Sequence, residues 1–390
     1  MNREYIVFAG RDHYNPLGIV RTLGECGIKS IVIINRQFKG PKMVPLSKYV
    51  KRCHYVDTLE EGIQLLLNRY SCYPLKCEIA MSNKSFILTG EDRVVHELNA
   101  HYEDLKDYFI FYHCTEEPMV SCLDKGIMYD IAEYVGFNIP KTWLVNPKIY
   151  EVPSDITYPV MTKAVNSFGS EWKDIVHVCY SERELYRVYG TIQSDEILLQ
   201  EYIDKSEELS YDGFSVADGK DVSIFASNTQ LYNLDGRYSP YWISRTPGDR
   251  DVDEKCLELT RRLVECIGLN GIFELELIVD KSGDIYFMEI NLRPSVIFWA
   301  YHVAGIPVVK LWCDAMLSGH IDHDMIPKIK EGFTSTAECY DYDVRVKGGM
   351  ISKRDWFKQL KNTDALLYKG RKDFLPFLSF MLYKFFHNRK

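Results

Sequence analysis

The chain lacks the features that mark several common classes of protein. Its eleven cysteines form no Cys-x-x-Cys pair and have no Cys/His spacing typical of zinc ligands. We therefore expect neither a disulfide framework nor a zinc site. No run approaches the roughly 20 apolar residues of a membrane-spanning helix, and the N-terminus lacks the basic-then-apolar pattern of a secretory signal. These absences favour a protein of the reducing cytoplasm.

Glycine-rich nucleotide motifs are also missing. An apolar run ends at Gly10, but Arg11, Asp12 and His13 follow where the dinucleotide-binding fingerprint needs further glycines. The loop after Lys163 does not follow the Walker pattern either. The sequence therefore indicates no nicotinamide or flavin site.

Length and charge limit the possibilities further. A chain of 390 residues exceeds the size at which single hydrophobic cores usually divide, so two or three domains are expected. The net charge of -8 is unevenly distributed. Residues 345–390 hold twelve Lys and Arg side chains against three Asp, a net charge of +9, so residues 1–344 carry -17. An acidic body argues against nucleic acid as the main partner.

The first part of the chain alternates strand and helix patterns. Residues 4–10 form an apolar strand pattern, residues 15–27 a helix pattern and residues 28–35 a second strand pattern. This order predicts a doubly wound α/β unit. The patterns further along predict helices over 59–70 and 91–105 and a strand over 86–90.

Residues 271–295 carry acidic side chains on two neighbouring strand patterns. Alternation places Glu274 and Glu276 on one face of the first run, and Glu289 lies in the second. The intervening residues 280–284 (DKSGD) have the composition of a hairpin loop. Carboxylates brought together repel one another unless a cation compensates, and Mg²⁺ is normally held by one or two carboxylates plus substrate phosphates. A hairpin with solvent-facing carboxylates is the alternative.

The order of these residues resembles the ATP-grasp superfamily. The resemblance rests on Glu276, followed on the next strand by Glu289 and Asn291, with Arg293 two residues further on. It implies an α/β (α+β) ATP-grasp fold that binds ATP and Mg²⁺, for which Mn²⁺ can substitute. Glu276, Glu289 and Asn291 are the implied metal ligands. Because Glu274 shares a face with Glu276, either glutamate can be the first ligand.

Two lysines extend the resemblance. Asp124 and Lys125 open a predicted helix, and a lysine at this point reaches ATP in the family. Lys163 ends a strand pattern and precedes a loop with Ser167 and Gly169, which resembles the family's flap over the phosphates. Small residues let backbone N–H groups approach phosphates, and lysine adds a compact charge. A solvated lysine at a helix start is the alternative for Lys125.

The resemblance implies further nucleotide and phosphate contacts. The strand over residues 196–203 ends in Gln200, Glu201, Tyr202 and Ile203, whose backbone would face adenine. Glu208, preferred over Glu207, would hold the ribose, and a plain acidic turn is the alternative. Arg293 would donate two hydrogen bonds to the γ-phosphate or to the acyl phosphate. Arg245 would place a second cation near the transferred phosphate.

The resemblance also implies a domain organisation. We expect a Rossmann-like pre-ATP-grasp domain over 1–118 and an ATP-grasp domain over 119–330. The latter divides into a small lobe of about 125–202 and a large lobe of about 203–330. A basic extension follows over 331–390.

The implied activity is that of an ATP-dependent carboxylate-amine ligase that forms an amide or peptide bond through an acyl phosphate. Its substrates would be an amino acid and a carboxylate, and homodimers are common among such enzymes. The overall likeness, including the segment TGEDR at 89–93, is most similar to D-aspartate ligase-like enzymes of bacterial cell-envelope or capsule loci. Dipeptide synthesis, another ATP-grasp reaction or a non-catalytic ATP-binding regulator is the alternative.

Residues 372–390 (KDFLPFLSFMLYKFFHNRK) combine apolar side chains at helical spacing with flanking basic residues. This pattern predicts an amphipathic helix that can lie on an anionic membrane surface, here the inner face of the cell membrane. A C-terminal helix docked on the acidic body, or on a partner subunit, fits the same pattern. The sequence leaves both interpretations open.

Overall fold

The structure, a computed structural model, describes residues 3–38, 40–71, 81–165, 175–232, 239–248 and 250–387. The chain forms two compact units. Unit 1 comprises Met1–Met119, Ser210–Glu274 and Asn291–Lys390, and unit 2 comprises Val120–Leu209 and Leu275–Ile290. The three domain ranges expected from the sequence stay a prediction.

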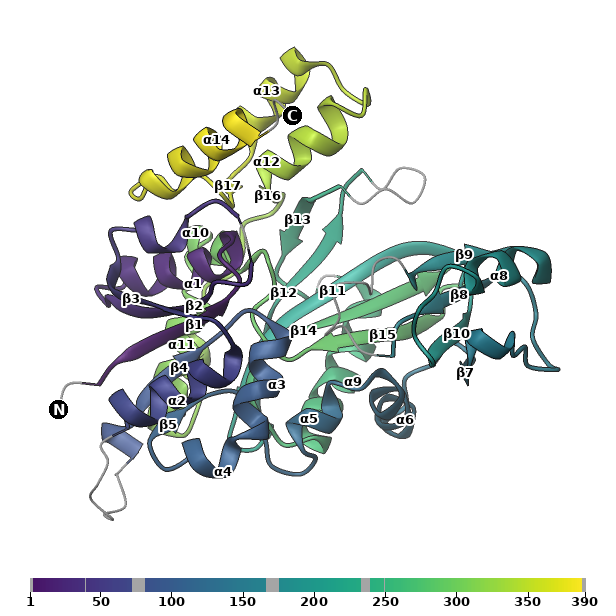
Figure 1. Cartoon of the computed structure of the whole chain (residues 1–390), viewed down its shortest axis with the longest axis horizontal. Helices are drawn as coiled ribbons and strands as arrows, with labels where there is room; N and C mark the ends of the chain where they lie inside the picture. The colour runs from purple at the N-terminus through teal and green to yellow at the C-terminus, as the bar shows by residue number, and fades with distance from the viewer. Residues whose placement is uncertain are drawn as a thin grey trace. The chain divides into compact units, whose positions relative to one another are not determined.

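Unit 1 begins with a parallel sheet in the order β3-β2-β1-β4-β5 (Figure 1). Helices α2 and α3 cover one face, where Ile63 and Val94 join Phe8 and Ile33 in the core. Helix α1 contacts β1, β2, α10 and α11. The doubly wound opening is therefore confirmed. The bounds are β1 (Tyr5–Gly10), β2 (Ser30–Asn35), β3 (Val50–Val56), β4 (Ser85–Leu88), β5 (Phe109–Ile110), α1 (Tyr14–Glu25), α2 (Leu59–Arg69), α3 (Asp92–Ala100), α10 (Phe298–Val303) and α11 (Val308–Ser318).

The helix expected over 91–105 is two helices in the structure. Helix α3 ends at Ala100, and α4 spans Tyr102–Leu105. His101, between them, has φ -105° and ψ 25°, which lies outside the α-helical region. The apolar periodicity continues across this break, so the pattern alone did not reveal it.

The second sheet has the strand order β15-β14-β11-β12-β13-β16-β17, with β6 beside β14. Helix α9 (Asp251–Cys266) contacts β12. The predicted hairpin loop is present, because the Gly283 N–H donates to the Asp280 carbonyl (3.2 Å) and Gly283 has φ +89°. The strands are β6 (His113–Cys114), β11 (Lys205–Val216), β12 (Asp221–Gln230), β13 (Tyr241–Arg245), β14 (Leu269–Asp280), β15 (Ile285–Asn291), β16 (Phe333–Thr336) and β17 (Ala365–Leu366).

Unit 2 contains an antiparallel sheet in the order β7-β10-β8-β9. Leu185 of α8 packs with Val160, Ile197 and Leu199 in its core. Helix α6 begins at Lys125 and ends before Gly136, whose φ of +109° suits glycine. The bounds are β7 (Thr142–Val145), β8 (Val160–Lys163), β9 (His177–Cys179), β10 (Ile197–Glu201), α6 (Lys125–Val135) and α8 (Glu182–Tyr189).

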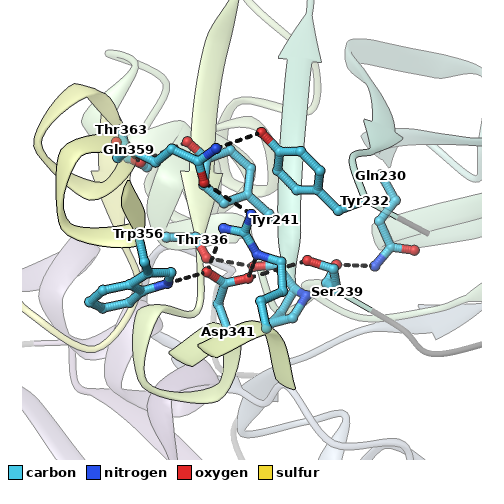
Figure 2. Close-up of polar contacts among 11 residues, drawn as sticks. Gln230, Tyr232, Ser239, Tyr241, Thr336, Asp341, Trp356, Gln359 and Thr363 are labelled. Atoms are coloured by element: carbon cyan, nitrogen blue, oxygen red, sulfur yellow. Dashed lines mark hydrogen bonds and ion pairs between the residues drawn. The ribbon is translucent and has the colours of Figure 1, made fainter. Parts of the chain in front are cut away.

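The C-terminal part of unit 1 is held by a buried ionic group, which we call the Asp341 network (Figure 2). The Asp341 carboxylate is fully buried and accepts two hydrogen bonds from the Arg345 guanidinium (2.7 and 2.8 Å). It also accepts from Trp356 Nε1 (2.7 Å) and Ser239 Oγ (3.2 Å). Arg345 donates in addition to Gln359 Oε1 (3.0 Å). Every strong acceptor position of the carboxylate is thus used by a protein donor.

Several short helices and α14 complete the chain. The last helix, α14 (Leu375–His387), contacts the 3₁₀ helix η1 (Val44–Leu46), and the Phe380 ring packs against that of Tyr368 at a tilt of 44°, with ring centroids 4.6 Å apart. The helix thus docks one face on the body of unit 1. The remaining helices among the described residues are α5 (Met119–Cys122), η2 (Met81–Asn83), η3 (Pro147–Ile149), η4 (His323–Met325), α12 (Glu338–Asp341), the π-helix η5 (Tyr342–Val346) and α13 (Lys353–Asn362).

Within the described part of the chain, no helix has both the length and the hydropathy needed to cross a lipid bilayer.

Candidate active site

Unit 2 brings four of the predicted residues together, and we call them the lysine–glutamate cluster: Lys125, Lys163, Glu276 and Glu289. Lys125 is the first residue of α6, where the Asp124 carboxylate caps the helix by accepting from the backbone N–H groups of Gly126 (2.8 Å) and Ile127 (3.1 Å). Such a cap fixes the direction of the first turn. The lysine is therefore held at a defined point rather than on a loosely placed loop.

The Lys125 ammonium contacts the Glu289 carboxylate at 2.7 Å, and the two side chains are 19% and 32% exposed. Burial alone would lower the pKa of Lys125, but the adjacent Glu289 carboxylate outweighs it and Glu276 adds to its effect, so the pKa is raised. Lys125 stays protonated under all ordinary conditions. The alternative interpretation of Lys125 as a solvated lysine is therefore wrong, because its ammonium group contacts the predicted metal ligand Glu289.

Lys163, at the end of β8, has the opposite electrostatic character. Burial and the nearby Lys125 lower its pKa to about 8, although Glu289 and Glu276 act in the other direction. The two lysines and two carboxylates of the cluster balance in formal charge, but Lys163 holds its ammonium group in a poorly hydrated place next to that of Lys125. Such a place favours an anionic ligand, because the ligand relieves the repulsion.

The predicted adenine-facing stretch is only partly available for a ligand. The Gln200 side chain is buried and donates to Thr142 Oγ1 (2.9 Å), so it supports the sheet. The backbone N–H of Glu201 donates to the Lys141 carbonyl (2.8 Å), and that of Tyr202 donates to the Pro159 carbonyl (3.3 Å). The backbone N–H groups of Glu201 and Tyr202 are thus already used within the protein. Of the predicted stretch, we therefore consider the backbone N–H of Ile203 as the donor to a ligand.

Glu208, the predicted ribose ligand, forms an ion pair with Lys205 on the same strand. Both side chains are about one third exposed, so the pair can open at little cost. Ser167 and Gly169, predicted in the loop after Lys163, lie outside the described residues.

Unit 1 holds the other predicted residues. The Asn291 side-chain amide donates to Glu274 Oε2 (3.2 Å), so Glu274 orients the asparagine. The Asn291 carbonyl oxygen accepts from Arg293 Nη2 (3.2 Å). Arg293 also binds Asp92 through two atoms, with Nε at 2.8 Å and Nη2 at 2.9 Å from the carboxylate oxygens. Glu274, Asn291, Arg293 and Asp92 thus form one hydrogen-bonded chain.

The TGEDR segment positions this arginine. Asp92 is the first residue of α3, and Asn15 donates to the carbonyls of both Gly90 (3.0 Å) and Pro294 (3.3 Å). The segment lies just after β4, and carboxyl ends of parallel strands are where α/β sheets bind ligands. Asp92 was not among the residues predicted for the site, although the TGEDR segment contributed to the resemblance. Its position directly after a buried parallel strand was the available signal.

Arg245 has a different environment from the one expected. Its guanidinium is paired through two nitrogens with Asp253 of α9, at 2.6 and 2.8 Å. Burial would raise the pKa of Asp253, but hydrogen bonds from Arg245 and Tyr211 outweigh it and hold the pKa well below its usual range. The pair fixes the start of α9 against β13. A contact between Arg245 and a phosphate stays a prediction.

A family model described as an ATP-grasp domain matches residues 122–296. Among curated proteins, the chain is 26% identical over 246 residues to the carbamoyl phosphate synthase large chain of Clostridium botulinum, covering 58% of this chain and 22% of that protein. It is 23% identical over 290 residues to the formate-dependent phosphoribosylglycinamide formyltransferase of Wolinella succinogenes, covering 70% of each. The chain thus spans about a fifth of the carbamoyl phosphate synthase large chain that it matches.

Solved structures share the fold. The L-amino acid ligase from Bacillus licheniformis superposes with a TM-score of 0.64 at 16% sequence identity, covering 86% of this chain and 79% of that one. At this identity the similarity concerns the fold.

Proposed function

We propose that this chain is an ATP-dependent carboxylate-amine ligase, because the model of an ATP-grasp domain matches residues 122–296 and the chain has the ATP-grasp fold. The observation that carries the proposal is the lysine–glutamate cluster. Two lysines and two carboxylates of unit 2 interact there, and one lysine has its pKa lowered to about 8. Phosphoryl transfer depends mainly on positioning and charge neutralisation, which such a cluster can supply.

The donor chemistry of Glu276 and Glu289 fits a magnesium ion, since carboxylate oxygens are the hard ligands that Mg²⁺ takes in proteins. Asn291, two residues after Glu289 on β15, is the third ligand we propose. When bound, Mg²⁺ supplies positive charge to the phosphate oxygens. We assign the first-ligand role to Glu276 rather than Glu274, because Glu276 acts on both lysines whereas Glu274 accepts a hydrogen bond from Asn291.

The chain's own cations have separate roles in this proposal. Lys125 and Lys163 bind phosphate oxygens of ATP, and Arg293, held by Asp92, binds the transferred phosphoryl group. The backbone N–H of Ile203 donates a hydrogen bond to the edge of the purine. Glu208 gives up its ion pair with Lys205 and binds the ribose hydroxyl groups instead. Arg245 stays a lesser candidate, because both of its Nη groups bind the fully buried Asp253, whereas the Asp92 partner of Arg293 is 21% exposed.

The proposed reaction has two steps. An oxygen of the substrate carboxylate attacks the γ-phosphorus of ATP, the bond to the bridging oxygen breaks, and ADP leaves with that electron pair. The amine of the second substrate then attacks the carbonyl carbon of the acyl phosphate. Inorganic phosphate leaves, and the nitrogen loses a proton to solvent. No cysteine or histidine nucleophile is required.

We further propose an amino acid as one substrate and a cell-envelope or capsule precursor as the other. Support for this narrowing is the overall likeness to D-aspartate ligase-like enzymes, together with the similarity of the fold to an L-amino acid ligase. Homodimer formation belongs to the same proposal. Dipeptide synthesis is the second candidate, because the L-amino acid ligase structure covers 86% of this chain.

The test is ADP formation by the full chain with Mg²⁺, ATP and a panel of amino acids of both hands, each with and without a second amino acid. Stimulation by a single amino acid pair supports dipeptide synthesis. Stimulation only when an envelope precursor is added supports the first candidate. Nucleotide binding without turnover across the panel supports a non-catalytic regulator and contradicts the ligase proposal.

A further inference from the structure

The outward face of α14 is apolar. Six side chains of this helix, from Leu375 to Phe386, are between 41% and 65% exposed. At 100° per residue they occupy an arc of about 140°. The opposite arc, which includes Pro376 and Phe380, faces unit 1. The exposed residues of the helix are Leu375, Leu378, Met381, Leu382, Phe385 and Phe386.

This composition is the reverse of an ordinary surface helix, whose outward side is polar. The apolar surface also continues beyond α14. A groove of about 620 Å³ runs between α14 and α13, and its lining includes Phe357, Leu360 and Met381. The Phe357 ring is itself 47% exposed. We call this face, formed by the outward side of α14 and the groove, the α14 surface.

Basic side chains surround the α14 surface. Lys347, Lys353, Lys369 and Lys384 line the groove. Lys384 contacts the Asp343 carboxylate, which Lys347 also binds (2.9 Å), and Glu338 is the other acidic residue of the lining, so four lysines face two carboxylates. Residues 345–390 carry a net charge of +9. The α14 surface is thus apolar at its centre and positively charged at its margin.

We propose that the α14 surface docks the protein on an anionic lipid membrane. The apolar arc enters the boundary between headgroups and acyl chains, and the surrounding lysines approach the negative headgroups. At 1.5 Å per residue, the 13 residues of α14 extend about 20 Å, short of the roughly 30 Å hydrocarbon core. The helix therefore lies in the plane of the membrane.

Charge favours this occupant over a second copy of the chain on the same face. A two-fold symmetric pair built on the α14 surface would bring two basic margins together, and like charges at an interface cost affinity. A membrane with anionic lipids offers the opposite charge over an unlimited area and an apolar layer beneath it. Docking of this kind does not depend on the ligase activity.

The experiment is vesicle co-sedimentation with the full chain. We expect binding to vesicles that contain phosphatidylglycerol and phosphatidylcholine, and binding at least tenfold weaker to phosphatidylcholine alone. Raising the salt concentration from 0.05 to about 0.5 M should weaken binding to the anionic vesicles, because salt screens exposed charges. Equal binding to both kinds of vesicle, or binding to neither, contradicts the proposal.

Three substitutions test the surface itself. Leu378→Gln, Leu382→Gln and Phe386→Gln, made together, change side chains that are 41% to 65% exposed, so folding should be preserved. We expect at least a tenfold loss of vesicle binding. The matched control is Leu144→Gln, Ile149→Gln and Met325→Gln, which are 56%, 71% and 66% exposed away from this surface. The control should bind like the wild type.

Two results would overturn the proposal. One is a triple variant that binds anionic vesicles as tightly as the wild type. The other is a wild-type dimer, seen by sedimentation without vesicles, that the triple variant abolishes, which would make the surface a self-association face. A truncated protein that lacks α14 should still include Asp373, because Asp373 binds the buried Arg21 (3.2 Å). Removal of Asp373 would destabilise the fold for a reason unrelated to membrane binding.

Discussion

The two main charged groups of the molecule use similar chemistry in different ways. In the Asp341 network one carboxylate meets one guanidinium, and Trp356 and Ser239 complete its hydrogen bonds. In the lysine–glutamate cluster two ammonium groups meet two carboxylates, and Lys163 has its pKa lowered to about 8. The first group is closed to solvent and satisfied. The second group is partly open and contains repelling like charges.

The difference separates a structural charge group from a candidate binding site. A buried ion pair persists when each donor and acceptor has a partner, and breaking it leaves an uncompensated charge. A pKa perturbed by burial and a nearby like charge, by contrast, is typical of sites that bind ions or catalyse reactions. Substitutions in the Asp341 network should therefore affect stability, and substitutions in the lysine–glutamate cluster should affect function.

The largest expected effect is that of Asp341→Ala. Removing the carboxylate leaves the Arg345 charge buried, so we expect a loss of about 3–5 kcal/mol in the free energy of unfolding, measured with urea. Asp314→Ala is the control, because Asp314 makes an i,i+4 pair with Lys310 that is 52% exposed on the aspartate side. Its loss should be below about 0.5 kcal/mol. Equal losses in both variants would contradict the structural role.

The next effect is that of Glu289→Gln on turnover. The amide keeps the shape of the side chain but loses the negative charge that Lys125 and the proposed Mg²⁺ require. We expect ATP turnover to fall about 10²- to 10³-fold, together with a lower unfolding midpoint because Lys125 loses its ion-pair partner. Glu133→Gln, on the exposed side of α6, is the control and should keep full turnover. Wild-type activity in Glu289→Gln would rule out the metal assignment.

Lys163→Met should separate function from stability in one variant. Removal of the crowded ammonium should weaken ATP binding about tenfold, measured by calorimetry, yet raise the free energy of unfolding by roughly 1–2 kcal/mol at pH 7. Lys141→Met, whose lysine is 53% exposed, is the control and should change neither quantity appreciably. A destabilised Lys163→Met protein would contradict the repulsion inferred in the cluster.

The same lysine predicts a pH dependence. Its pKa of about 8 in the folded protein lies below the ordinary value of 10.5, so the unfolded chain binds more protons between these two values. The cost of the charged lysine is complete below pH 8 and fades toward pH 10.5. The stability gain of Lys163→Met should therefore shrink across this window in urea titrations. ATP affinity of the wild type should fall as the pH rises through 8, and that of the variant should not.

The smallest effect should come from Asp92→Asn. The asparagine can still accept one hydrogen bond, but it loses the paired carboxylate that orients Arg293. We expect turnover to fall about three- to tenfold while the KM for ATP changes less, as for a positioning residue. Asp104→Asn, with the aspartate 65% exposed, is the control. A change in the KM for ATP alone would argue for a nucleotide-binding role instead.

Local patterns were sufficient for much of the fold. Alternation and turn composition located the doubly wound opening and the hairpin loop around Gly283, because side-chain period and glycine backbone preference are properties of short segments. Periodicity missed the break at His101, since a break in backbone geometry need not interrupt an apolar pattern. The site assignment was also only partial. It included Lys125 and Glu289 but not Asp92, whose role depends on a contact across 201 positions of sequence.

The sequence by itself determined which residues have the chemistry for an ATP and metal site, and in what order they follow one another. Only the tertiary structure decided how their charges combine. It paired Lys125 with Glu289 and Arg245 with Asp253. It also buried Lys163 near Lys125, which lowers the pKa of Lys163. It also turned the apolar side of α14 outward while docking the other side on unit 1. The reason is that charge interactions and burial depend on distances between segments far apart in the chain, which no local pattern records.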